Sequence, residues 1–246
     1  MDRVIDYSWE RFTPEQIKAI PAIGVVRYLA YGNGGKVIRK DEYDSLSHGG
    51  VGIALIWETG ETAHLGGYEA GRAHGREARW MADELRHNGV LCAAIDTDIS
   101  PTEIELVLEY VRGFRDGAHP GGTCSVYGTA YVIDKCVDHG IVEYGYQTNA
   151  RGWYDNKRVS KHAALLQHLP VDGKYDPNDV LQDYWGQSTG EDMPLSREDI
   201  DRVSDAVVRK IQRDVIGDTL GAPKTVANAA RVAIRTTIRE VFLKKK

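Results

Sequence analysis

The sequence predicts an α/β fold in which a (β/α)₈ TIM-like barrel precedes a C-terminal helical hairpin. Apolar, strand-like segments alternate with helix-like segments along residues 1–185, a pattern typical of a parallel sheet covered on both faces. The sequence shows about seven such strands, or eight if residues 175–180 form one, which suggests a (β/α)₈-type barrel. A doubly wound open sheet is the alternative, but no Gly-x-Gly-x-x-Gly motif follows a strand. Gly32-Asn33-Gly34-Gly35 matches that motif only in part and is better explained as a flexible loop.

The predicted strands are recognised by their apolar and β-branched composition. They cover residues 4–5, 23–29, 51–57, 90–95, 124–127, 142–147, 163–167 and 175–180. The predicted helices lie between them and shorten late in the chain: from residue 13, 40–46, 68–88, 100–114 and 131–138. Pro14 favours the first turn of a helix, Ser100-Pro101 begins another, and Asn88-Gly89 ends the longest one.

A second region follows a linker. Gly, Ser and Pro disfavour regular structure over residues 186–195, so the barrel is assigned to residues 1–185. Residues 196–246 show two helical stripes of apolar side chains, broken at Gly221-Ala222-Pro223. A two-helix hairpin cannot bury both stripes by itself. We expect this segment to self-associate or to dock on a partner, and a pair of helices capping the barrel is the alternative.

Composition excludes several classes of protein. A net charge of −5 argues against a general nucleic-acid binder. No apolar run reaches the roughly 20 residues that span a bilayer, and the N-terminus has no apolar signal core, so neither membrane insertion nor a signal peptide is expected. Cys92, Cys124 and Cys136 are odd in number and lie in apolar stretches, which predicts free buried thiols. The histidines show no metal-ligand spacing, and no metal or other cofactor is predicted.

Polar side chains gather where the predicted strands end, which is where chemistry collects in a barrel of parallel strands. The candidate catalytic residues are Asp6, Glu58, Asp96 and Asp98. The candidate substrate-binding residues are Trp9, Tyr28, Trp57, Tyr127, Gln147, Gln167, Asp176 and Asn178. Aromatic faces beside carboxylates predict a sugar-binding cleft, because sugar rings offer C–H faces for stacking and hydroxyls for hydrogen bonds. The alternatives are a turn cap for Asp6 and a solvated loop charge for Glu58.

Asp96 and Asp98 form the most informative pair. Asp96 directly follows the apolar residues 91–95, where a carboxylate would be partly buried and costly unless it is paired or used. Asp98 is expected on the same face of the strand as Asp96, because side chains alternate between the two faces with a period of two residues. Repulsion between two close carboxylates makes one of them hold its proton more tightly, as a general acid requires. The alternative, a divalent cation held by Asp-x-Asp, lacks further ligands of matching spacing.

Three groups of motifs carry a family resemblance. Asp6-Tyr7-Ser8 lies on the first strand, Asp96-Thr97-Asp98 follows the fourth, and Leu166-Gln167-His168 and Asp176-Pro177-Asn178 come late. In this order they resemble the Asp-x-Ser, the catalytic Asp-x-Glu and the late motifs of the family 25 glycoside hydrolases, the Chalaropsis-type lysozymes. The chain looks closer still to a glycoside-hydrolase-like branch with the same barrel, the DUF1906 type, which is common in actinobacterial and phage proteins. The resemblance covers about residues 3–182.

The resemblance implies hydrolysis of a β-1,4 bond in peptidoglycan, with Asp98 or Glu58 as acid and Asp96 or Asp6 as base or electrostatic stabiliser. Asp98 departs from the family pattern, because the family's general acid at that position is a Glu, which is one methylene longer. A misplacement of about 1 Å can cost on the order of a hundredfold in rate. Asp98 is therefore expected to act poorly unless the backbone compensates or Glu58 supplies the acid. The late motif also lacks the family's Trp and Tyr.

The sequence thus predicts a domain that binds, and by resemblance cleaves, a cell-wall polysaccharide. A wall-directed domain without an export signal, joined to an oligomerising segment, fits a phage virion protein such as a minor tail protein, present in the host cytoplasm before assembly. Its other partners would be tail proteins or copies of itself, bound through residues 196–246. The alternative is a non-catalytic structural or wall-binding tail protein with a degenerate barrel. A cytosolic metabolic barrel enzyme is expected to carry a late phosphate-binding Gly loop, which is not seen.

Overall fold

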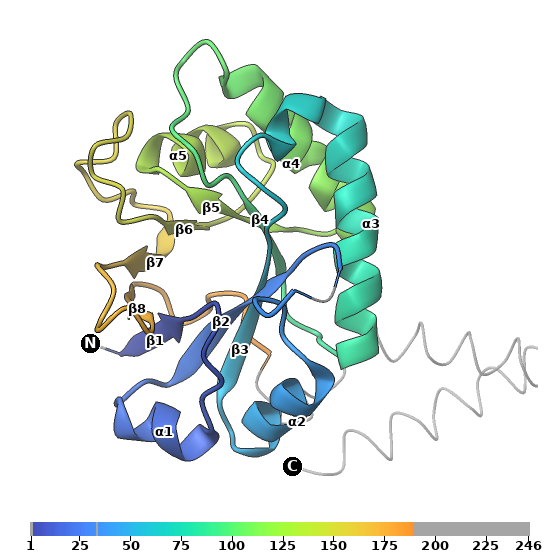
Figure 1. The fold of residues 1–246 in the computed structure, drawn as a ribbon. Coiled ribbons are helices and arrows are strands. Elements are labelled where there is room, and N and C mark those ends of the chain that lie inside the picture. The colour runs from blue at the N-terminus through green and yellow to red at the C-terminus, as the bar shows by residue number, and fades with distance from the viewer. Residues whose placement is uncertain (1, 33, 189–246) are drawn as a thin grey trace, which may run out of the picture. The chain divides into compact units, whose positions relative to one another are not determined.

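A computed structural model describes residues 2–32 and 34–188, and eight strands within them close a barrel (Figure 1). The strands are β1 (Arg3–Asp6), β2 (Gly24–Leu29), β3 (Gly52–Trp57), β4 (Leu91–Ala94), β5 (Ser125–Gly128), β6 (Gly145–Gln147), β7 (Ala163–Gln167) and β8 (Asp176–Val180). They pair in chain order, and β8 returns to pair with β1. The predicted barrel is confirmed, and the open sheet is excluded.

The strand β8 differs from its neighbours in direction. Strands β1 to β7 pair in parallel, whereas β8 is antiparallel to both β7 and β1. The cause is a hairpin in which Val171 pairs with Tyr175, and in which Asp172 and Gly173 have φ of 53° and 66°. Two consecutive positive φ angles are the mark of a type I′ turn, which joins antiparallel strands. The expected uniformly parallel sheet is therefore corrected at β8.

Helices follow the first five strands and surround part of the barrel (Figure 1). They are α1 (Pro14–Ala19), α2 (Lys40–His48), the short 3₁₀ helix η1 (Ala63–Gly66), α3 (Gly67–Leu85), α4 (Ile104–Ala118) and α5 (Ala130–Asp138). Thr13 caps α1 in a capping box with Gln16. Up to residue 188 no helix follows β6, β7 or β8, so the late helices are absent there rather than shortened. None of the described helices is both long enough and apolar enough to cross a membrane.

The helices α3 and α4 pack backbone to backbone through glycines. A Cβ atom on Gly71 of α3 would lie 2.0 Å from the carbonyl oxygen of Tyr110, and one on Gly113 of α4 would lie 2.0 Å from that of Tyr68. Gly75 and Gly117 repeat the same contact one turn further along each helix. No side chain fits at these positions without moving the helices apart.

The core has two layers, and strand β3 contributes to both. Ile53, Leu55 and Trp57 face the helices, whereas Ala54 and Ile56 face the barrel interior, as the period of two requires. The indole of Trp185 fills the amino end of the interior, where a Cβ on Gly24 would lie 2.6 Å from its ring. The three cysteines are buried and unpaired, as expected.

Two predicted segments fall partly or wholly outside the described residues. Only residues 186–188 of the linker 186–195 are described, and the helical segment 196–246 lies outside. Asn33 of the predicted glycine-rich loop also lies outside.

Candidate active site

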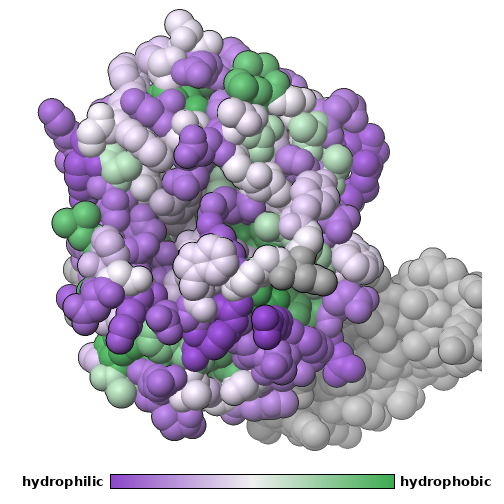
Figure 2. All heavy atoms as spheres, viewed as in Figure 1, coloured by the Kyte–Doolittle hydropathy of each residue, from purple (hydrophilic) through white to green (hydrophobic). Residues whose placement is uncertain are grey.

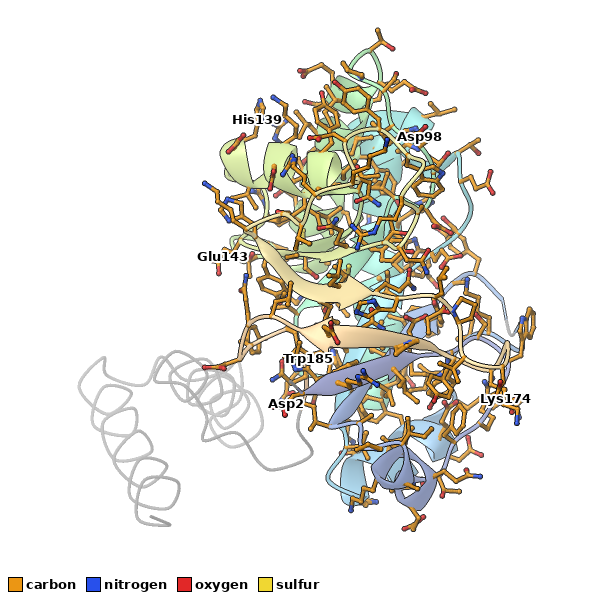
Figure 3. All side chains as sticks on the ribbon, turned by 90° about the vertical axis from the view of Figure 1, so that its left-hand side faces the viewer. Asp2, Asp98, His139, Glu143, Lys174 and Trp185 are labelled. Atoms are coloured by element: carbon orange, nitrogen blue, oxygen red, sulfur yellow. The ribbon has the colours of Figure 1, made fainter. Side chains whose placement is uncertain are left out.

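The carboxyl ends of the seven parallel strands meet at one mouth of the barrel. In Figure 3, Asp98 and Lys174, which follow β4 and β7, lie toward this end, and Asp2 and Glu143, which precede β1 and β6, lie toward the other. Figure 2 looks into the mouth, where mainly hydrophilic residues surround the opening. A cavity of about 550 Å³ lies there. It brings together eight of the predicted residues: Asp6, Glu58, Asp96, Tyr28, Tyr127, Gln167, Asp176 and Asn178.

Asp6, the last residue of β1, is the most firmly held carboxylate of the cavity. Its Oδ1 accepts a hydrogen bond from the Tyr28 hydroxyl at 3.0 Å, and its Oδ2 accepts from Gln167 Nε2 at 3.1 Å and Asn178 Nδ2 at 2.9 Å. Burial raises the pKa of Asp6 above its ordinary value, although the three donors and the Lys36 ammonium oppose the shift. Asp6 is therefore a fixed negative group when ionised.

Gln167 is itself oriented by two donors. Its Oε1 accepts from the Tyr127 hydroxyl at 3.1 Å and from the Asn149 backbone nitrogen at 3.4 Å. Its amide nitrogen is thereby directed at Asp6, so strands β1, β5 and β7 meet in one hydrogen-bond chain.

Asp176, at the start of β8, is the second carboxyl group on this side. Burial and the neighbouring charge of Asp6 raise the pKa of Asp176 to about 6. Its Oδ1 is buried and has no hydrogen-bond partner among the residues that the structure describes. A carboxyl group of this kind carries a proton in mildly acidic solution.

Glu58 and Lys36 form an ion pair on the opposite side of Asp6. The Lys36 ammonium donates to Glu58 Oε1 and lies 4.2 Å from the centroid of the Tyr28 ring. Because the Tyr28 hydroxyl bonds to Asp6, Lys36 connects two carboxylates of the site. Among the described residues, Lys36 is the only basic one that lines the cavity, and its charge opposes the raised pKa of Asp6 and of Asp96.

Asp96 lies two residues beyond the end of β4 and is partly buried. Its pKa is raised first by burial and then by the charge of Glu58, while Lys36 opposes the shift. After burial, the pKa of Asp96 is thus raised by the charges of Glu58, Glu61 and Asp6, and not by that of Asp98. Asp96 is a carboxyl group that holds its proton more tightly than an ordinary Asp.

The predicted pairing of Asp98 with Asp96 is wrong. Asp98 is exposed, does not line the cavity, and accepts a hydrogen bond from the backbone nitrogen of Tyr154 at 2.7 Å. The physical reason is that β4 ends at Ala94, so the alternation of a strand no longer applies at residue 98. Asp98 instead ties down the loop between β6 and β7.

Three other predicted binding residues also lie outside the cavity. Trp57 is 1% exposed and packs on the helical side of β3. Gln147 is fully buried and holds the β6–β7 loop, since its side chain bonds to Asn156 Oδ1, Arg158 O and Ser160 N. Trp9 is 75% exposed and lines a neighbouring hollow of about 160 Å³ between the β1 and β8 ends.

The cavity contains residues that the sequence did not single out as a site. They include Lys36, Tyr146, Thr148 and Asn149. Lys36 is 22 residues from Glu58, in a segment without strand or helix signals, so no spacing could indicate the contact. Thr148 and Asn149 directly follow β6, so the strand-end rule applied to Gln147 could have found them. Among the described residues no cluster of His, Cys, Asp and Glu is arranged to hold a metal ion.

Comparison with known proteins agrees with this architecture. The model of a family described as Rv2525c-like, glycoside hydrolase-like domain matches residues 15–205. The Tat-secreted protein Rv2525c of Mycobacterium tuberculosis, solved in complex with HEPES and with L-tartrate, is 26% identical with a TM-score of 0.67. The match covers 76% of this chain and 98% of that one. A comparison with curated proteins finds no significant match.

Two more distant structures share the fold. A B. stearothermophilus protein is 15% identical with a TM-score of 0.55, over 73% of this chain and 96% of that one. A muramidase from Acremonium alcalophilum is 14% identical with a TM-score of 0.51, over 74% of this chain and 95% of that one. At these identities the similarity concerns the fold alone.

Proposed function

The chain belongs to the family of Rv2525c-like, glycoside hydrolase-like domains, and from this premise we propose that it binds peptidoglycan in the barrel mouth and hydrolyses a glycosidic bond there. One observation carries the proposal: three carboxyl groups of raised pKa, Asp6, Asp96 and Asp176, share one cavity, and of these Asp6 is held by three hydrogen-bond donors that favour its charged form. Glycoside hydrolysis needs two carboxyl groups in different protonation states. The choice of peptidoglycan rests on the motifs that resemble the lysozymes.

We assign the proton donor to Asp96. Burial, and after it the negative charge of Glu58 that Lys36 holds in place, favours the protonated form of Asp96, which can then protonate the leaving oxygen of the scissile bond. Asp6 is the group that stabilises the positive charge on the sugar ring, because its carboxylate is already oriented by Tyr28, Gln167 and Asn178. A water molecule then adds to the ring carbon and gives its proton to the ionised Asp96, which restores the acid. Glu58 and Lys36 act as positioning residues for Asp96.

The experiment is release of reducing ends from purified actinobacterial peptidoglycan. The test variant is Asp96→Asn, and the matched control is Asp98→Asn, the same chemical change two residues away outside the cavity. Removal of a general acid costs about 10²- to 10⁴-fold in rate, so Asp96→Asn is expected to lose at least a hundredfold. Asp98→Asn keeps an oxygen that can accept the Tyr154 bond, so it is expected to retain the wild-type rate. Equal rates in the two variants would refute the assignment.

A second candidate function is glycan binding without catalysis. It is favoured by the position of Asp98, because this residue stands where the resembled family has its catalytic Glu and yet lies outside the cavity. In that case no reducing ends are released, and the wild type and both variants sediment with the cell wall.

The place of action is a further part of the proposal. A minor tail protein of a phage virion fits a wall-directed barrel joined to residues 196–246, whose two apolar stripes need a partner. Removal of residues 191–246 is expected to convert an oligomer into a monomer in sedimentation velocity. An unchanged mass would contradict the tethering role of this segment.

A further inference from the structure

We propose that the site is a groove for a linear glycan several sugar units long, which crosses the barrel mouth from Tyr31 to Trp153. The inference rests on the proposed function and adds to it the path and the minimum length of the substrate. An extended site of this kind implies cleavage within a chain rather than at its end.

The first observation is a second hollow that adjoins the cavity. It measures about 340 Å³, lies at the ends of β2 and β3, and is lined by Ala30, Tyr31, Glu58, Thr59 and Gly60. Glu58 lines both hollows, so the two are neighbours. The central cavity alone falls within the range of about 300–1,000 Å³ that holds a complete small ligand. The additional space therefore fits a ligand that continues beyond the central cavity.

The second observation is that the two ends of this groove face each other. On the far side the central cavity is lined by Asn149, Ala150 and Trp153 from the loop between β6 and β7. Strands β6 and β7 lie four places from β2 and β3 in a closed ring of eight, which is halfway round. Strands β2 and β3 and strands β6 and β7 accordingly lie on opposite sides of the ring of strands in Figure 1.

Tyr31 is a fixed aromatic platform at one end. Tyr31 as a whole residue is 56% exposed, yet its ring packs edge-on against buried Trp57 at 5.0 Å and against His74 at 5.6 Å between ring centroids. His74 Nδ1 in turn lies 2.9 Å from the Tyr110 hydroxyl. Trp57, predicted to touch substrate, instead supports the exposed ring that does so in this proposal.

Trp153 is the platform at the other end, on a loop that buried hydrogen bonds hold in place. Asn156 is fully buried, and its amide nitrogen donates to Thr148 O and Ala150 O at 3.0 Å each. Its Oδ1 accepts from Gln147 Nε2 at 2.9 Å. Asp98 fixes the next residue of the loop, Tyr154, through its backbone nitrogen. The loop position of Trp153 is thus set before any ligand binds, which reduces the entropic cost of binding.

The chemistry between the platforms suits a polysaccharide. Aromatic rings at both ends offer faces for the C–H surfaces of sugar rings, and the carboxyl and amide groups between them offer partners for hydroxyls. Asp6 and Asp96 lie in the central cavity, between the two aromatic ends. A bound chain would therefore extend past the scissile bond in both directions.

The test measures affinity against chain length. The probes are peptide-free peptidoglycan glycan strands, fractionated into disaccharide, tetrasaccharide and hexasaccharide, titrated calorimetrically into the full chain. Affinity is expected to rise with length. Tyr31→Ala and Trp153→Ala are each expected to weaken hexasaccharide binding by about tenfold, which equals ~1.4 kcal/mol, and to change disaccharide binding less than about threefold.

The controls separate loss of a platform from loss of structure. Trp80→Ala removes a tryptophan that is 60% exposed on α3, away from the mouth, and is expected to leave all affinities unchanged. Tyr31→Phe and Trp153→Phe keep an aromatic face and are expected to restore most of the affinity. Thermal unfolding of each variant checks that the barrel is intact.

The outcomes distinguish the two proposals. Equal affinity for all lengths, or wild-type hexasaccharide binding by both alanine variants, would overturn the groove and leave peptidoglycan binding standing. Failure of every oligosaccharide to bind, together with failure to sediment with the cell wall, would overturn the proposed function and the groove with it.

Discussion

The ion pair beneath the β1 and β2 ends permits a quantitative test of what holds the mouth in shape. Arg27 of β2 is fully buried, its Nε lies 2.7 Å from Glu42 Oε1, and its guanidinium stacks on the Tyr7 ring at 4.2 Å. Glu42, in α2, also accepts from the Tyr7 hydroxyl at 3.1 Å and lies 3.1 Å from Arg11 Nε. Replacement of Arg27 by Met keeps the packing volume but leaves the Glu42 charge buried with fewer partners.

The expected magnitude follows from this arrangement. Removing one partner of a buried pair costs about 3–5 kcal/mol, because the remaining charge is left unpaired. Arg11 and Tyr7 still contact Glu42, so we expect the lower end for Arg27→Met, about 3 kcal/mol in the free energy of unfolding. The double variant Arg27→Met/Glu42→Leu removes both charges and is expected to be more stable than the single variant.

Urea unfolding monitored by tryptophan fluorescence measures both free energies. A loss below about 1 kcal/mol for Arg27→Met would mean that water or other groups solvate Glu42, since exposed ion pairs contribute about that little. A double variant less stable than the single one would show that the pair stabilises the fold beyond the cost of burying its charges. Either result would refute the reasoning.

Three further predictions follow from the geometry. Gly71→Ala is expected to lower the free energy of unfolding by about 1–3 kcal/mol, because the new Cβ would meet the carbonyl oxygen of Tyr110, even though Ala favours a helix over Gly by ~1 kcal/mol. Thermal unfolding measures the loss, and a stabilised variant would contradict the close packing of α3 and α4. Asp6→Asn is expected to lower the pKa of Asp176 from about 6, because a neighbouring negative charge is removed, and an unchanged value in carboxyl ¹³C NMR titrations would contradict the coupling. The pKa of Asp176 in the folded protein lies above its ordinary value of 3.8, so the stability that Asp176 contributes is fully present below pH 3.8 and is lost as the pH rises through about 6. Asp176→Asn is expected to flatten the pH dependence of the unfolding free energy over this range. An identical profile in the variant would exclude Asp176 as its source.

Most strands of the barrel can be predicted from the sequence, because they are short, apolar and bounded by polar residues. Two further features of the structure, the antiparallel β8 and the close packing of α3 and α4, are also indicated by short motifs in the sequence. Asp172-Gly173 is typical of a two-residue hairpin turn and indicates the antiparallel β8. Gly71 and Gly75, like Gly113 and Gly117, are spaced four apart, which puts them on one helix face and indicates close helix packing.

By itself the sequence determined the barrel and the carboxyl and amide groups at its strand ends, Asp6, Gln167 and Asn178 among them. Asp6 and Gln167 end parallel strands, where the alternation of side chains and the shared direction of neighbours dictate which ones reach the mouth, whereas Asn178 reaches it from β8, which runs the other way. Only the tertiary structure decided the positions of Lys36, Asp98 and Trp153. They belong to loops, where the path of the backbone depends on long-range contacts such as Asp98 with Tyr154, and no local period connects a residue's number to the direction of its side chain.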